Sequence, residues 1–217
     1  VTGRRLEHVR DVQGNGVGDR LCVGKLNGPI GNGRIECIDR TRLELAIEWE
    51  REPPPPMPVA LAVALPRPPI LRRVLFNASM LGVKEIHLVA AARAHRSYWQ
   101  SRSLRPEAIR KQLCLGLEQA VDTGLAEVRL HKSFRSFAED FLPSRLEDTP
   151  ALVAQQGAVD SCPRSVDGPR FLLVGPEGGW EPFELQAFAA AGVRAVDLGV
   201  RVLRVDTAVI SFLTRLF

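Results

Sequence analysis

The sequence has few of the features that mark membrane, secreted or metal-binding proteins. No run approaches the roughly 18 apolar residues that a membrane-spanning helix needs. The first residues, VTGRRLEHVRD, lack the apolar core of a signal peptide. The four cysteines are far apart and form no CxxC pair, and the four histidines are scattered. We therefore expect a cytoplasmic protein with no membrane segment, no disulfide framework and no bound metal.

Neither positive nor negative charge is in large excess, because the net charge is only +4. The basic residues, however, are unevenly distributed along the chain. The segment 93–111 carries six Lys and Arg residues against one Glu, and it contains Tyr98 and Trp99. Phosphates attract such cations, and aromatic rings can stack on bases. This pattern indicates either an RNA-binding surface or a solvated loop and helix face. The predicted RNA-binding residues are Arg93, Arg96, Arg102 and Arg105.

Proline marks the clearest boundary in the chain, at REPPPPMP (51–58). Before it, the runs DRLCVGKLNG, GNGRIECIDR and RLELAIEW have the length and near-alternation of strands in a small β-barrel. Proline runs are stiff, extended and poor in backbone donors, so they join elements rather than build them. We predict a domain at 1–52, a linker at 53–58 and a second domain at 59–217.

After the linker, apolar strands alternate with amphipathic helices. The predicted strands are 59–65, 84–90, 126–131, 151–154, 170–175 and 193–199. The predicted helices are 69–81, 105–123, 134–142, 182–191 and 206–217, with Asp206 placed to cap the last one. This alternation predicts an α/β domain with a mostly parallel sheet.

Two glycine-containing loops follow predicted strands, GPEGG at 175–179 and GVRVLRV at 199–205. Ligands of parallel α/β sheets bind beyond the carboxyl ends of the strands, and glycine lets a ligand approach the main chain. The loops match neither GxGxxG nor the phosphate loop, no Lys follows, and Glu177 opposes phosphate. The alternative for a bare glycine loop is a tight turn that needs a positive φ.

Taken together, LLVGPEGGWEPFEL (172–185) and DLGVRVLRVDTA (197–208) resemble the C-terminal signature of a known family. It is the RsmE group of the SPOUT superfamily, the small-subunit (16S) ribosomal RNA uridine-N3 methyltransferases. Upstream, ASMLGVKEIHLVAAARAHRS, LEQA and EHVRDVQGNGVGDRLCVGKLNG are similar to further segments of that family.

The resemblance implies an α/β SPOUT-type parallel sheet with a C-terminal trefoil knot, preceded by a PUA-like β-barrel that binds RNA. It also implies a homodimer, S-adenosyl-L-methionine as cofactor, the small ribosomal subunit as partner, and no metal. The implied cofactor-binding residues are Leu173, Gly175, Glu177, Gly178, Gly179, Leu198, Gly199, Val202, Leu203 and Thr207, with Gln155 in a third loop, VAQQGA.

In the implied reaction, N3 of a uridine attacks the sulfonium methyl group after losing its proton. Arg204 is the candidate for orienting the base or its phosphate and for stabilising negative charge. Asp206 is either the base or an organiser of the loop. Glu177 either faces the sulfonium or fastens its own loop.

The sequence departs from the family pattern at three places. Asp206 stands where the family has Glu, Asp122 and Thr123 replace a Gly-Arg pair, and Met80 replaces a Glu. Two alternatives therefore stay open: an enzyme of the same fold with another RNA target, such as a ribose 2′-hydroxyl, and a non-catalytic RNA-binding or ribosome-assembly factor.

Overall fold

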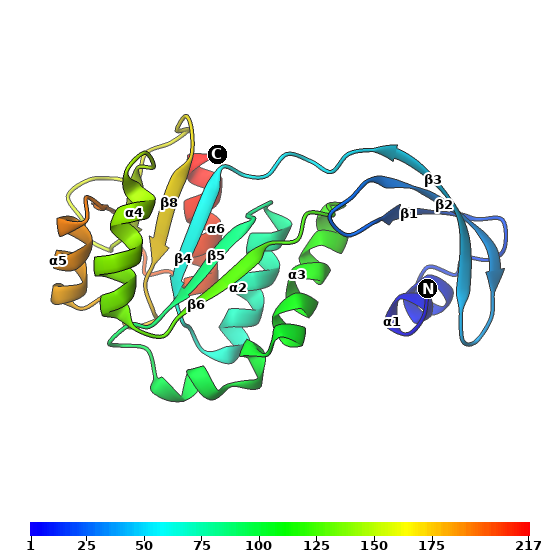
Figure 1. Cartoon of the computed structure of the whole chain (residues 1–217), viewed down its shortest axis with the longest axis horizontal. Helices are drawn as coiled ribbons and strands as arrows, with labels where there is room; N and C mark the ends of the chain where they lie inside the picture. The colour runs from blue at the N-terminus through cyan, green and yellow to red at the C-terminus, as the bar shows by residue number, and fades with distance from the viewer. The chain divides into compact units, whose positions relative to one another are not determined.

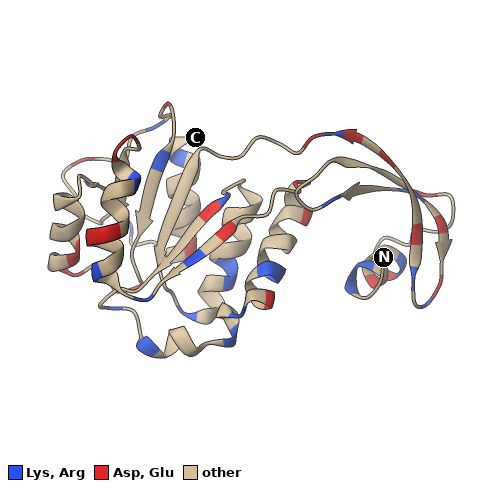
Figure 2. Ribbon diagram, viewed as in Figure 1, with Lys and Arg blue, Asp and Glu red and all other residues tan.

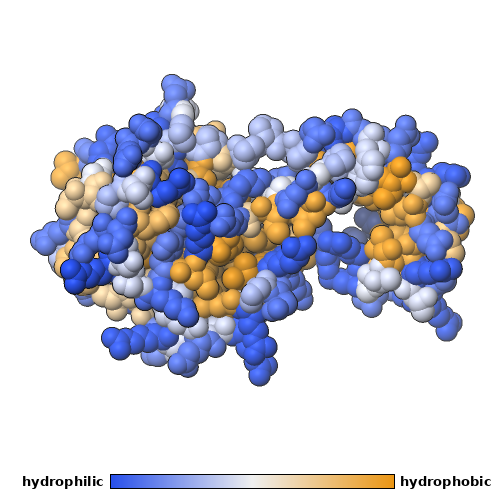
Figure 3. All heavy atoms as spheres, viewed as in Figure 1, coloured by the Kyte–Doolittle hydropathy of each residue, from blue (hydrophilic) through white to orange (hydrophobic).

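The computed structural model describes residues 1–217, which form two compact units (Figure 1). One unit comprises Val1–Pro54 and Val121–Gly124, and the other comprises Pro55–Ala120 and Leu125–Phe217. None of the helices has the length and the apolarity to cross a membrane. The surface seen in Figure 3 is largely hydrophilic, with apolar residues showing between the polar ones.

The smaller unit is an antiparallel sheet with a helical segment packed on it. Its elements are α1 (Arg4–Glu7), the π-helical turn η1 (His8–Val12), β1 (Arg20–Gly24), β2 (Ile30–Ile38) and β3 (Leu43–Arg51), with strand order β1-β2-β3. The three strands overlap the predicted apolar runs, although β2 begins one residue earlier and β3 ends two residues later. The sequence does not indicate the helical turns. Leu6 of α1 joins Ile35 and Leu43 in a small buried core.

The larger unit contains a parallel sheet of six strands, which confirms the predicted α/β class. Its strands are β4 (Val59–Ala64), β5 (Glu85–Val89), β6 (Glu127–His131), β7 (Ala151–Ala154), β8 (Arg170–Val174) and β9 (Arg194–Val196), in the order β6-β5-β4-β8-β7-β9. Its helices are α2 (Pro68–Met80), η2 (Arg96–Gln100), η3 (Arg102–Leu104), α3 (Pro106–Ala120), η4 (Ser136–Phe141), α4 (Leu142–Leu146), α5 (Pro182–Ala190) and α6 (Val205–Leu216).

Helices cover both faces of this sheet, α2, α3 and α6 on one face and η4, α4 and α5 on the other (Figure 1). Successive side chains of a strand point to opposite faces of the sheet, so they pack alternately against the two helical layers. In β4, Val59, Leu61 and Val63 face the first layer, and the intervening alanines face the second. The alanines leave room on the second face for larger residues, among them Phe171 and Trp180.

Helix α3 is shorter than predicted, because it ends at Ala120 instead of Thr123. Val121 adopts a positive φ of 52°, which no α-helix continues. The Asp122 carboxylate then accepts the backbone N–H of Thr123 at 2.6 Å and of Gly124 at 2.9 Å. Asp side chains that bond the following main chain favour turns over helix, and this explains the early end.

Two further boundaries differ from the prediction. Strand β9 ends at Val196, three residues early, since the Asp197 carboxylate bonds to loop backbone and turns the chain out of the sheet. The helical segment predicted at 134–142 runs from Ser136 to Leu146 as η4 and α4.

Candidate functional site

The candidate site is a cavity of about 310 Å³ at the carboxyl ends of β7 and β8. Parallel α/β sheets bind ligands at this edge, near the point where the strand order reverses. Three loops and the start of α6 form its walls. The lining residues are Ala154, Gln155 and Gln156; Val174 to Trp180; Asp197, Leu198, Gly199, Arg201, Val202 and Leu203; Val205 and Ala208; and Arg93. No group of three or more His, Cys, Asp or Glu side chains is placed to hold a metal ion.

A different structural reason explains the presence of glycine at each of three positions in the loop after β8. Gly179 has a φ of 72°, and its N–H bonds to the Pro176 carbonyl at 2.8 Å, which is the tight turn that the sequence left open. Gly175 is favoured by the ring of Trp180, whose nearest atom would stand only 3.0 Å from a Cβ at this position. A Cβ at Gly178 would meet the aliphatic stem of Arg93 at 3.2 Å.

Arg93 holds the same loop in place through two hydrogen bonds. Its guanidinium donates to the Gly178 carbonyl at 2.6 Å and to the Glu181 carboxylate at 2.9 Å. The predicted RNA-binding residue Arg93 thus lines the pocket and holds its wall. Glu184, which is fully buried, accepts the backbone N–H of Ala92 and that of Glu181, both at 2.8 Å.

The Glu177 carboxylate is engaged by another residue of the protein, Arg67. Its carboxylate accepts the Arg67 side chain at 3.2 Å and the Arg67 backbone N–H at 3.3 Å. Arg67 precedes α2, just after β4, so this pair joins the loops that follow two neighbouring strands. Glu177 therefore fastens the loop, one of the two roles that the sequence allowed.

Asp197 joins the other two loops of the pocket. Its carboxylate accepts the Gly199 N–H at 2.8 Å and the Gly157 N–H at 3.1 Å. This role could not be read from the sequence, because the aspartate lies inside a run that resembles a strand.

Asp206 is not a helix cap, contrary to the prediction. The residue at the N-cap of α6 is Arg204, which makes no capping bond, and Asp206 lies within the first turn. Its side chain is 5% exposed, and its Oδ2 atom is 2.9 Å from Arg73 Nε and 3.1 Å from Arg204 Nη2. The other oxygen, Oδ1, is buried with no hydrogen-bond partner. The carboxylate turns toward these two cations rather than toward the backbone.

Two predicted cofactor residues do not line the cavity. Leu173 is fully buried on the opposite face of the sheet with Phe171, because alternate residues of β8 point to opposite sides, and Val174 takes the expected place. Thr207 is exposed and lies outside the lining. The lining also includes several residues that the sequence did not indicate, among them Trp180, Asp197 and Arg201.

The remaining predicted RNA-binding arginines, Arg96, Arg102 and Arg105, are exposed in the segment before α3. Figure 2 shows Lys and Arg residues on this segment and on α2 and α3. Tyr98 and Trp99, by contrast, are half-buried and pack against the main core. These two rings are structural, so the cations alone remain as candidates for nucleic-acid contact.

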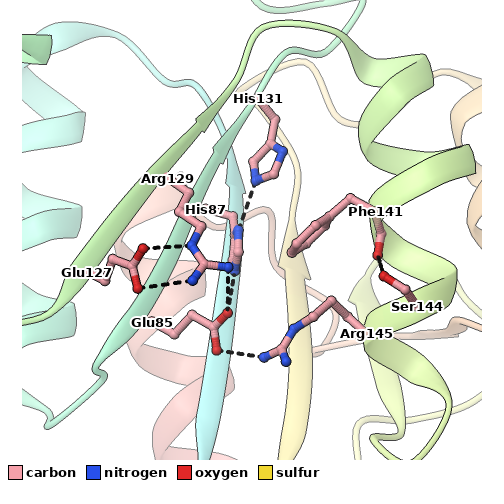
Figure 4. A network of polar contacts seen from close by, with 8 residues as sticks. All are labelled: Glu85, His87, Glu127, Arg129, His131, Phe141, Ser144 and Arg145. Atoms are coloured by element: carbon pink, nitrogen blue, oxygen red, sulfur yellow. Dashed lines mark hydrogen bonds and ion pairs between the residues drawn. The ribbon is translucent and has the colours of Figure 1, made fainter.

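A second polar cluster lies on β5, β6 and α4 (Figure 4). The buried His87 bonds to His131 at 2.9 Å and to the Glu85 carboxylate at 3.1 Å. Arg145 of α4 donates to Glu85 at 2.7 Å. Burial lowers the pKa of His87 to about 4, against the opposing effect of Glu85. Burial and the neighbouring Arg129 also lower the pKa of His131.

Comparison with known proteins decides the family. Residues 53–216 match the model of the RNA methyltransferase domain. The chain is also 32% identical over 209 residues to ribosomal RNA small subunit methyltransferase E of Treponema pallidum (strain Nichols), covering 94% of this chain and 79% of the relative. The chain belongs to the RsmE family of RNA methyltransferases.

Solved structures with the same fold include two methyltransferases bound to S-adenosyl methionine. The ribosomal RNA small subunit methyltransferase E of Neisseria gonorrhoeae is 20% identical with a TM-score of 0.79, over 98% of this chain and 88% of that one. A putative methyltransferase of Legionella pneumophila is 21% identical with a TM-score of 0.74, over 96% and 86%. At this identity the two structures establish the shared fold.

Proposed function

We propose that this protein transfers a methyl group from S-adenosyl-L-methionine to N3 of a uridine in the 16S RNA of the small ribosomal subunit. The observation that carries the proposal is the three-loop cavity at the carboxyl edge of the sheet, in a chain of the RsmE family. The Treponema relative is named for the small-subunit RNA, and the Neisseria structure contains the cofactor.

The residues of the cavity fit this cofactor. Its volume of about 310 Å³ lies within the range of small-molecule sites. Leu198, Val202 and Leu203 supply apolar surface for a purine ring, and the Asp197 carboxylate suits a ligand that carries positive charge. The residues proposed to hold the cofactor are Gly175, Glu177, Gly178, Gly179, Leu198, Gly199, Val202, Leu203 and Gln155.

The bound cofactor would supply an electrophilic methyl group. This chain must hold the uracil in line with it, and positioning of two reactants can lower a barrier by roughly 7–11 kcal/mol in favourable cases. Arg204 is exposed at the start of α6, beside the lining residues Leu203 and Val205. Its guanidinium is the group proposed to orient the substrate and stabilise the negative charge that develops as N3 loses its proton.

Asp206 is proposed to organise the site rather than to accept that proton. One of its oxygens is engaged by Arg73 and Arg204, and the other is buried away from solvent. The two bonds to the guanidinium groups hold the carboxylate in place, and it in turn anchors both arginine side chains.

We further propose the domain arrangement of the family for this chain. Residues 1–52 form a PUA-like β-barrel domain that binds RNA, 53–58 a linker and 59–217 a SPOUT domain with a C-terminal trefoil knot. The antiparallel sheet of β1 to β3 supports the first assignment. The knot is supported by Arg215 of α6, which donates to the carbonyls of Cys162 and Leu198 in two separate loops.

The proposal includes a homodimer that works in the cytoplasm. Val200 in the loop after β9 is 89% exposed and lies outside the cavity lining, and a second copy of the chain would cover it.

The test is calorimetric titration of the protein with S-adenosyl-L-methionine. We expect a micromolar dissociation constant. Replacing Ala154 by Leu fills the cavity and should weaken binding at least about tenfold. The matched control, Ala189→Leu, places the same side chain on the exposed face of α5, outside the cavity, and should change nothing. Absence of both heat and thermal shift at millimolar cofactor would refute the proposal.

A further inference from the structure

A single carboxylate oxygen holds two arginines together at the start of α6. Arg73 comes from α2 and Arg204 from the N-cap of α6, and both bond to Oδ2 of Asp206. Because the two bonds end on the same atom, the guanidinium groups are held side by side.

The charges of this trio, Arg73, Arg204 and Asp206, do not balance within the protein. Two cations share one anion, and neither arginine has another ion-pair partner in the structure. The side chain of Arg73 is 48% exposed and that of Arg204 is 64% exposed, while that of Asp206 is 5% exposed. Each guanidinium has five N–H donors, so most of them point to solvent and remain available to a ligand. A second anion on the exposed side would complete the charge balance.

The exposed N–H donors favour a group with several acidic oxygens. Guanidinium groups bind phosphate and carboxylate through paired hydrogen bonds, and two adjacent arginines can share the oxygens of one phosphate. The N-terminus of α6 adds the partial positive charge of its free backbone N–H groups in the same place.

The location relates this ligand to the substrate. Leu203, Val205 and Ala208, which flank Arg204 and Asp206 in sequence, all line the cofactor cavity, but Arg73 and Arg204 do not. The anion would therefore lie beside the cofactor and outside its pocket. In an RNA methyltransferase, the molecule that must reach this position is the RNA strand.

We propose that Arg73 and Arg204 together bind one phosphate group of the RNA substrate next to the target nucleotide, with Asp206 as the residue that positions them. The proposal adds Arg73 to the site and rests on the proposed function, since it identifies which part of the substrate that site holds. A phosphate held here fixes the backbone, and hence the uracil, relative to the cofactor.

The experiment compares Arg73→Gln with Arg72→Gln. Arg72 is the next residue on α2, is exposed and has no ion-pair partner, so it controls for net charge. RNA binding is measured with isolated small-subunit RNA over a series of salt concentrations, and cofactor binding by calorimetry.

We expect Arg73→Gln to raise the dissociation constant for RNA about tenfold and to lower the salt slope by about one. Arg72→Gln should stay within about twofold of the wild type, because the Arg72 side chain does not pair with Asp206 and is not part of the two-arginine group. Cofactor affinity should be unchanged in both variants. Arg73→Lys keeps the positive charge but loses the paired N–H donors of the guanidinium, so it should give an intermediate RNA affinity.

Equal effects of Arg72→Gln and Arg73→Gln on RNA affinity and salt slope would overturn the proposal. So would a loss in Arg73→Gln that appears only as a lower melting temperature, with RNA binding intact in the folded protein. These outcomes are independent of the proposed function, which fails instead if the wild type does not bind the cofactor.

Discussion

The indole ring of Trp180 lies against Gly175, and a Cβ at position 175 would be in unusually tight contact with it. A Cβ there would stand 3.0 Å from Nε1 and 3.1 Å from Cδ1 of the ring. Trp180 is 4% exposed and packs edge-to-face on Phe188 with ring centroids 4.9 Å apart, so any shift of the ring would disturb this packing. The first glycine of the loop thus serves the packing of the pocket wall.

Gly175→Ala should therefore weaken both the fold and the pocket. Overpacking of this kind costs about 1–3 kcal/mol, and the displaced ring would shift the loop that lines the cavity. We expect a lower urea midpoint and a weaker affinity for the cofactor. The control is Gly16→Ala, since a Cβ at Gly16 meets nothing within 4 Å. If Gly175→Ala matched this control in both measurements, the packing explanation would be wrong.

Stability should fall as the pH drops from about 6.5 to about 4, because His87 is buried as the neutral imidazole. Burial lowers its folded pKa to about 4, below the unfolded value near 6.5, so the unfolded state takes up more protons between these limits. The stabilisation is complete above pH 6.5 and is lost on acidification. For this residue the loss from pH 7 to pH 5 amounts to about 2 kcal/mol.

His87→Gln removes this titration while an amide can keep both hydrogen bonds, to Glu85 and to His131. Arg129 and Arg145 also face the cluster, and both are present in the wild type and in the variant. The measurement is urea unfolding at pH 7 and pH 5. We expect a smaller difference between the two pH values in the variant, and an identical difference would show that His87 does not control it.

Glu177→Gln should have only a small effect, since Glu177 fastens its loop through a partly exposed pair with Arg67. Such pairs contribute about 0–1 kcal/mol. We expect the ratio of affinities for S-adenosyl-L-methionine and S-adenosyl-L-homocysteine to stay unchanged, because the two ligands differ in the sulfonium charge. A marked loss of preference for the charged ligand would place Glu177 at the sulfonium instead.

Charge reversal at Arg96, Arg102 and Arg105 should weaken RNA binding and reduce its dependence on salt. Each phosphate contact that is lost lowers the salt slope by about one. Reversal at Lys132 and Arg164, two exposed cations outside this segment, is the control. An unchanged slope in the first variant would mean that the segment is solvated surface.

The sequence contained enough to predict the layout of the larger unit, because its apolar runs and glycine stops mark each element. It also identified the loops of the pocket, since glycines that follow buried strands fall at the ligand-binding edge of a parallel sheet. Which single side chains face the cavity was harder to predict. Leu173 and Val174 are both apolar neighbours in β8, and only their alternation in the folded strand decides which one faces the cavity.

Residues that act through tertiary contacts were beyond the reach of the sequence. Asp206 has the position of a helix cap, but it pairs with Arg73, which lies 133 residues earlier in the chain. Tyr98 and Trp99 resemble stacking rings in a basic segment, yet they pack on the core. In each case a partner distant in sequence overrides the local pattern.

Nucleoside mass spectrometry tests the central claim most directly. The protein is incubated with isolated small ribosomal subunits and S-adenosyl-L-methionine that carries a deuterated methyl group, and the 16S RNA is then digested and analysed. The account predicts deuterated 3-methyluridine at one position, with none formed by Arg204→Ala. Label found only in another nucleoside, or no label despite cofactor binding, would contradict it.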